Sequence, residues 1–479
     1  IKDKRWFEYG DSGGGMTSAT NWAYLLGKYK DPRLSWFYHF LRQDKGADAP
    51  AGAKGDGHGT DKFEQLRNLD KATYEDVVFY TEGIPQDDPF DENPVKAFRD
   101  IGTTVFKEGW DKDDFVFVMR TGPFYNHQHI DQGSFWLADR GEIFVEERPL
   151  ANSNYYDDPI YESWLTQPVG HSTILVNGNH QSQRTGDHRD FAPGFEDHAF
   201  ISHFLDGSHA AFVTGDIGRL YWGEVKDLSR NVLYLKPDAV LMLDVAVPAE
   251  QDAAINLLYQ AKRFEDIQAG SEKSTITKND ATLHIMHLSP QAVDVEAVKT
   301  PHYLKTLLNV RPLEREGMLT VTAKTQGKPL LMANLLTATA TGEQPEITTA
   351  VGDGFVRGEV AGRRFAYTTE PGKPYQVDGF TTDALAVSYG ADAVFVASAR
   401  AYENQAVRIS TDAPMTFEWS DADGLHYYLD TPATVQIRLD RAVAQVALNG
   451  ERMKGYSYDK KAKTLTLQLP RGEGRLTLD

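Results

Sequence analysis

The chain has 479 residues, and its 69 acidic and 50 basic residues give it a net charge of −19. This length exceeds one ordinary domain, and 41% hydrophobic residues exclude a disordered or collagen-like chain. The negative charge argues against a nucleic-acid or anionic-membrane surface, so a polyanionic substrate would need a locally basic site. Because cysteine is absent, disulfides, thiolate zinc sites and cysteine nucleophiles are excluded.

The same features give expectations about the compartment in which the protein acts. A cysteine-free chain of this length suits a periplasmic or secreted bacterial protein. No run of about 18 apolar residues is present, so we expect no membrane span. The first residues, IKDKRWFEYGDSGGG, do not resemble a signal peptide and do not begin with methionine, so we expect a mature or truncated chain.

Residues 1–114 are predicted to be helical. The segment 20–41 has apolar residues at helical spacing and is interrupted at Asp31-Pro32, which predicts two helices joined by a turn. From residue 115 the pattern changes to short β-branched and aromatic runs bounded by Gly, Asp, Asn and Pro. We therefore expect a multidomain α+β protein, with an antiparallel β-sandwich at 115–400 and a C-terminal β module at 401–479.

Histidines are concentrated in one part of the predicted sandwich, and the sharpest pattern is YNHQHIDQGSF, residues 125–135. In an extended strand His127, His129 and Asp131 would point to the same face, because side chains alternate with a period of two. Two imidazoles and a carboxylate side by side are costly unless a metal or an anion lies between them. The pattern indicates either a ligand site or a hydrogen-bonded buried polar cluster.

Two later segments could complete such a site. A strand at 141–147 would carry a carboxylate back towards the histidines if it forms a hairpin with the preceding strand. His129, Glu146 and His171 would then give a ligand set that suits one divalent ion, Zn²⁺ first and Mn²⁺ second. Glu147 competes with Glu146, since only one of two consecutive strand residues can face the ion.

Four segments of the chain stand out together: NHQHIDQGSFWLADRGEIFVEE, the tyrosine pair at 155 and 156, GHSTILVNG, and RNVLYLKPDAVLMLDV at 230–245. Together they resemble the heparinase II/III-like polysaccharide lyases, a family that also includes dermatan sulfate epimerases. The resemblance implies that residues 1–114 are the C-terminal end of an α/α toroid and that a large sandwich follows. It also implies that further catalytic groups, including a tyrosine acid, lie in a toroid half supplied by the same precursor or by a partner chain.

The resemblance also implies roles for individual residues. His127 matches the catalytic histidine, and Asn126 beside it is a candidate contact to the substrate carboxylate. His129 and His171 match the two histidine ligands of the metal. Glu146 matches the acidic ligand, while epimerase-like members would use the next residue, Glu147.

The implied activity is β-elimination on a uronic-acid-containing polysaccharide, with alginate or a glycosaminoglycan as the substrate. Neutralising the uronate carboxylate stabilises an enolate-like intermediate, a base removes the C5 proton, and an acid protonates the departing oxygen at C4. Arg120, Arg184 and Arg189 are candidates for pairing with substrate anions. The alternatives are a uronate C5-epimerase, which needs the same proton abstraction, and a non-catalytic carbohydrate-binding sandwich.

Overall fold

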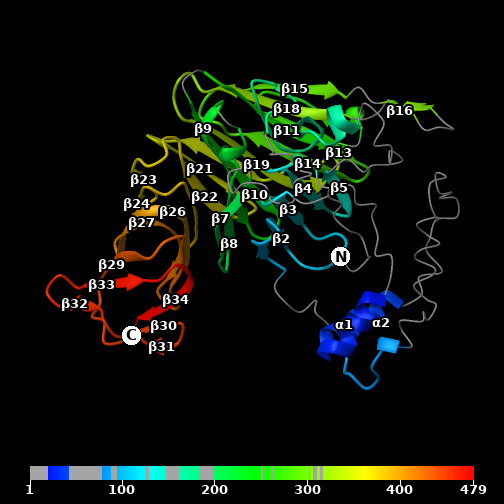
Figure 1. The fold of residues 1–479 in the computed structure, drawn as a ribbon. Helices are drawn as coiled ribbons and strands as arrows, with labels where there is room; N and C mark the ends of the chain where they lie inside the picture. The colour runs from blue at the N-terminus through cyan, green and yellow to red at the C-terminus, as the bar shows by residue number, and fades with distance from the viewer. Residues whose placement is uncertain are drawn as a thin grey trace.

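The structure is a computed structural model that describes most of the chain. The described residues are 20–42, 78–87, 94–124, 129–146, 161–183, 198–221, 223–249, 252–261, 263–300, 303–305, 310–312 and 317–478. Figure 1 shows a body of antiparallel sheets, with a small helical hairpin well apart from the C-terminal strands.

The helical hairpin consists of α1 (Thr20–Tyr29) and α2 (Pro32–Arg42), as the sequence predicts. At the break, an Asp31 carboxylate oxygen accepts a hydrogen bond from the backbone N–H of Arg33 at 2.8 Å, and Pro32 begins the second helix. Among the described residues, α-helix occurs only here and at positions 78–79, so the toroid stays a prediction. No described helix is long and apolar enough to cross a membrane.

Two smaller antiparallel sheets form one layer of the β-body. The five-stranded sheet follows chain order: β1 (Lys96–Phe98), β2 (Thr103–Lys107), β3 (Val116–Arg120), β4 (Phe135–Asp139) and β5 (Glu142–Val145). The four-stranded sheet has the order β15 (Asp294–Lys299), β18 (Gly317–Lys324), β11 (Ala254–Ala261) and β6 (Ile174–Val176). Short helices η2 (Tyr161–Leu165) and η3 (Pro168–Gly170) precede β6, and a separate hairpin joins β16 (Tyr303–Lys305) to β17 (Val310–Pro312).

The central layer is an eight-stranded sheet. Its order is β12 (Ile267–Gln268), β13 (Lys273–Lys278), β14 (Ala281–His287), β19 (Leu330–Ala340), β10 (Ala239–Pro248), β9 (Val225–Leu235), β8 (Ala210–Asp216) and β7 (Phe200–Asp206). Short helices η5 (Gly218–Leu220) and η6 (Phe264–Asp266) lie in its connections.

The third layer is a fifteen-stranded sheet that contains the C-terminal part of the chain. Its main path is β20 (Ile347–Val351), β21 (Phe355–Val360), β22 (Arg363–Thr368), β25 (Ala386–Tyr389), β26 (Ala393–Glu403), β27 (Val407–Ser420), β28 (Gly424–Leu429), β34 (Gly472–Leu478), β30 (Val446–Leu448) and β31 (Glu451–Arg452). Attached to this path are β23 (Tyr375–Val377), β24 (Phe380–Thr382), β29 (Ala433–Leu439), β32 (Ser457–Asp459) and β33 (Thr464–Leu469).

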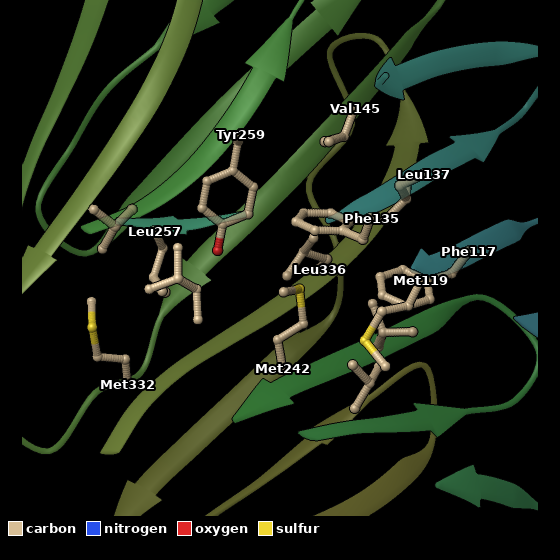
Figure 2. Packing of buried hydrophobic residues seen from close by; sticks show 14 of the residues in the cluster. Phe117, Met119, Phe135, Leu137, Val145, Met242, Leu257, Tyr259, Met332 and Leu336 are labelled. Atoms are coloured by element: carbon tan, nitrogen blue, oxygen red, sulfur yellow. The ribbon is translucent and has the colours of Figure 1, made fainter. Parts of the chain in front are cut away.

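The central sheet is buried on both faces, because the side chains that point to either side of its middle strands are apolar. On β10, Met242 belongs to the core shared with Phe135 and Tyr259 of the smaller sheets, and Figure 2 shows these side chains between the layers. Its neighbour Leu241 belongs instead to the core shared with Phe365 of the C-terminal sheet. Continuous apolar strands are typical of sheets covered on both sides.

The sheets do not stop at the domain boundaries expected from the sequence. Strands β1 and β2 precede residue 115, where helix was expected, and pair in register with β3. Phe106 of β2 is fully buried and stacks on Tyr234 at 5.3 Å between ring centroids, so packing draws this short segment into the sandwich. Strand β26 likewise runs across position 400 within one sheet.

Candidate functional site

The hairpin that follows the histidine motif forms as expected. Strands β4 and β5 are antiparallel and pair Leu137 with Val145. Arg140 and Gly141 form the turn with φ angles of +53° and +80°, the left-handed pair that a type I′ hairpin turn requires. This hairpin forms one edge of the five-stranded sheet.

The segment from His129 to Ser134 is a turn and not the strand that was expected. Ser134 donates a backbone hydrogen bond to the Asp131 carbonyl at 2.9 Å, and β4 begins only at Phe135. Gly133 has a φ of +80°, and a Cβ there would lie 3.0 Å from the Ile217 side chain. The alternation argument that placed His129 and Asp131 on one strand face is therefore wrong, because the chain reverses here.

Two of the predicted ligand residues nevertheless lie together. The His129 and His171 rings are both almost fully buried, and their centroids are 5.1 Å apart with the planes inclined at 54°. His171 follows η3, where its backbone N–H donates to the Pro168 carbonyl at 3.1 Å. The Ile130 N–H donates to the Thr166 carbonyl at 2.8 Å, which joins the two segments beside the histidines. Two imidazoles so placed could share a metal ion or an anionic group.

A buried amide cluster supports the turn after His129. The Gln183 side chain receives a hydrogen bond from the Gln132 N–H at 3.0 Å and donates one to the Gln132 carbonyl at 2.6 Å. Thr173 donates to the same carbonyl at 2.5 Å. Tyr221 donates to the Ile174 carbonyl at 2.7 Å, and burial raises the pKa of this tyrosine, which therefore stays neutral.

A buried ion pair lies beneath both turns. The Arg230 Nε donates to an Asp244 carboxylate oxygen at 2.8 Å, and the two side chains are 0% and 1% exposed. The Arg230 Nη1 donates to the carbonyls of Gly133, at 2.5 Å, and Ser172, at 3.1 Å. One guanidinium thus contacts both histidine-bearing segments.

The sequence of this region matches a known domain family. Residues 91–300 match the model of the heparinase II/III-like C-terminal domain. Over these residues the sequence is that of a heparinase II/III-like C-terminal domain. The resemblance predicted from the histidine motif is therefore confirmed.

Solved structures show the same fold at low sequence identity. Heparan sulfate lyase HepC of Pedobacter heparinus superposes with a TM-score of 0.52 at 14% identity, covering 76% of this chain and 50% of that one. A heparinase III gene product gives 0.51 at 13% identity, with coverage of 77% and 50%. This chain therefore spans about half the length of these structures. No curated protein sequence matches it.

Within the heparinase II/III-like domain, Glu146 does not join the histidines. Its carboxylate pairs with the Lys278 ammonium group at 3.0 Å, and the same ammonium group donates to the Ile143 carbonyl. Across the described residues, no three His, Asp or Glu side chains are grouped as a metal site would require. Glu146 is thus paired with a residue of β13, and a metal held by His129, Glu146 and His171 stays a prediction.

Arg120 is also placed differently from the prediction that it binds substrate. Its side chain is 3% exposed and donates to the carbonyls of Ile101 and Pro123, the latter at 2.8 Å. Its backbone is bonded to the histidine turn, since its carbonyl accepts from the Gly133 N–H at 2.7 Å. Arg120 therefore braces the loops around the site.

Other predicted site residues lie outside the part of the chain that the structure describes. They are Asn126, His127, Glu147, Arg184 and Arg189. The sequence reasoning missed Gln132, Gln183, Arg230 and Asp244. Of these, only Gln132 lies within the motif, and the Asp-Gln-Gly run there could have indicated its turn.

Proposed function

We propose that the protein is a polysaccharide lyase that cleaves a uronic-acid-containing anionic polysaccharide by β-elimination and leaves 4,5-unsaturated uronate ends. The observation that carries this proposal is the convergence of His129 and His171, buried at 5.1 Å within a heparinase II/III-like domain. The fold shared with a heparan sulfate lyase favours a glycosaminoglycan as the substrate, and alginate is the second choice.

In this proposal the chain supplies the groups that stabilise charge at the uronate. Asn126 and His127 would hydrogen-bond the carboxylate, so that negative charge developing after C5 proton removal is stabilised. A base takes the C5 proton, and an acid returns a proton to the O4 leaving group. We propose that the acid belongs to a helical toroid half carried by the same precursor or by a partner chain.

We further propose one divalent ion beside the site, with Zn²⁺ as the first choice and Mn²⁺ as the second. His129 and His171 fit two of its ligand positions, and Glu147 is the candidate for the third because Glu146 is paired with Lys278. When bound, such an ion would tie the two turns together. Elemental analysis should find about one ion per chain in the wild type and in Glu146→Gln, and none in Glu147→Gln. No stoichiometric metal in the wild type would refute this part of the proposal.

The place of action is likewise a proposal. A cysteine-free chain suits the bacterial periplasm or the extracellular space, where such polysaccharides are encountered. Fractionation of the native host should find the protein outside the cytoplasm, and a cytoplasmic location would contradict the proposal.

The activity test is ultraviolet absorbance, because only elimination creates a conjugated uronate. The chain would be incubated with heparan sulfate, chondroitin sulfate and alginate, alone and joined to the proposed toroid half. Rising absorbance that His127→Ala removes supports the lyase, and His209→Ala, an exposed histidine on the β7–β8 turn, is the matched control. Inverted C5 configuration without absorbance would indicate an epimerase instead. Binding without either change would indicate a carbohydrate-binding sandwich.

A further inference from the structure

The buried ion pair of the central sheet, Arg230 with Asp244, has a large cost in desolvation free energy. Arg230 and Asp244 are direct cross-strand neighbours on β9 and β10, and both are almost completely removed from solvent. Burying two charges costs more than their attraction returns unless further hydrogen bonds satisfy them. A pair of apolar residues could fill the same volume, so the polar contacts of this pair need an explanation.

The donors of Arg230 supply that explanation. Nε and Nη2 bond the two Asp244 carboxylate oxygens at 2.8 and 3.3 Å, which orients the guanidinium plane. Nη1 then reaches two backbone carbonyls, those of Gly133 and Ser172. Gly133 lies in the turn that begins at His129, and Ser172 is the residue after His171. The two turns come from segments about 40 residues apart and meet at one nitrogen.

Neighbouring contacts fix the remaining freedom of the same turns. Gln260 on β11 donates from its side chain to the His171 carbonyl at 3.2 Å, and its N–H donates to the Ser172 hydroxyl at 3.0 Å. The guanidinium lies 5.5 Å from the Phe135 ring centroid, at the start of β4. The contacts with Asp244 and Phe135 hold the Arg230 side chain in one position. Its hydrogen bonds to both turns can therefore fix the distance between them.

We propose that Arg230 and Asp244 are positioning residues that set the spacing of the two histidine-bearing turns, residues 129–134 and 171–173. The Arg230 guanidinium bonds the Asp244 carboxylate and the backbone carbonyls of Gly133 and Ser172, so it acts on the turns through their backbone. The catalytic consequence rests on the proposed lyase function, whereas the effect on the turns does not.

The structural test is hydrogen exchange measured by mass spectrometry on peptides that cover the two turns. In Arg230→Met we expect exchange to become about 10-fold faster or more in both turns, because charge-assisted hydrogen bonds are lost, with strands β27 to β29 unchanged. Arg230→Lys retains the charge but cannot reach every acceptor, so it should give a smaller increase. It also provides a second variant should Arg230→Met fail to fold.

Lys236→Met is the matched control. Lys236 also pairs with a carboxylate, that of Asp206, and donates to a carbonyl, that of Gly207, both at 2.7 Å, but it supports the β7–β8 turn. It should leave exchange at the histidine turns unchanged. A uniform increase in Arg230→Met, no increase, or turns that are unprotected in the wild type would overturn the inference.

Kinetics separates this inference from the proposed function. If the wild type is a lyase, Arg230→Lys should lower kcat about 10-fold or more and change KM less than about 2-fold, since the first turn lies just after Asn126 and His127, the proposed transition-state groups. An inactive wild type would refute the lyase and leave the exchange result to decide the positioning role. A fall in kcat with unchanged exchange would overturn the positioning role alone.

Discussion

The two faces of the central sheet are buried by different means. The face towards the C-terminal sheet packs Leu241 and Leu243 of β10 into one cluster with Phe365 and Phe395. The face towards the smaller sheets also has an apolar core, but it buries the Arg230–Asp244 pair as well. The comparison teaches that burial alone does not distinguish the faces. The charged pair occurs where one side chain bonds the two histidine-bearing turns to each other.

The largest effect on stability is expected on the apolar face. Leu241→Ala removes a fully buried side chain and should lower the free energy of unfolding by about 2–5 kcal/mol. Urea titration gives this value, and hydrogen exchange at residues 129–134 should rise no more than elsewhere. If exchange in this variant rose more at residues 129–134 than elsewhere, the apolar face would also hold the histidine turns, and the distinction between the two faces would be wrong.

The second-largest effect is expected in catalysis. In the proposed mechanism His127 stabilises transition-state charge, so for His127→Ala kcat should fall on the order of 10²–10³-fold with the melting temperature nearly unchanged. The ultraviolet assay and a thermal scan measure the two quantities. A folded variant with full activity would remove His127 from the proposed mechanism.

The third prediction concerns the buried carboxylate of Asp139. Burial raises the pKa of Asp139 to about 7, and its cationic neighbour Arg140 is exposed. The folded state therefore holds the proton more tightly than the unfolded chain, and this stability is lost as the pH rises from about 4 to about 7. Asp139→Asn should flatten that decline, on the order of 1–3 kcal/mol between pH 5 and pH 8 in urea titrations. An identical decline in the variant would show that other groups cause it.

The smallest effect is expected at the two arginines that the sequence predicts to bind substrate. Arg184→Ala combined with Arg189→Ala should raise KM several-fold and change kcat less, because these contacts would bind ground state and transition state alike. The effect should weaken as salt screens the attraction between these arginines and a polyanionic substrate. Arg408→Ala, an exposed position on β27, is the control. An unchanged KM at low salt would place the anion site elsewhere.

The sequence was sufficient for features that depend on local chemistry. Asp31-Pro32 predicted the break between the helices, and the hairpin expected after the histidine motif forms with a turn at Arg140 and Gly141. Strands β1 and β2 were missed because their three and five residues carry little pattern of their own, and the burial of Phe106 comes from distant partners.

The candidate site could be predicted only in part for the same reason. His129 and His171 were found from residue type and family resemblance, and they do lie together. The role of Arg230 could not be found, because the Gly133 carbonyl that it contacts is 97 positions away in the chain. The ion pair between Glu146 and Lys278 could not be predicted either, because it spans 132 positions. Contacts between residues so far apart depend on the fold, and no short sequence pattern indicates them.

The direct pairing of Arg230 with Asp244 also bears on how β9 and β10 find their alignment during folding. In a sheet, a slip of one residue turns every side chain to the opposite face. A slipped hairpin would separate the two charges onto different faces and bury one of them in the leucine-rich layer against the C-terminal sheet. Apolar residues alone would tolerate such a slip far better, since both faces of these strands are hydrophobic. The ion pair therefore penalises misaligned strands and selects one register for the hairpin.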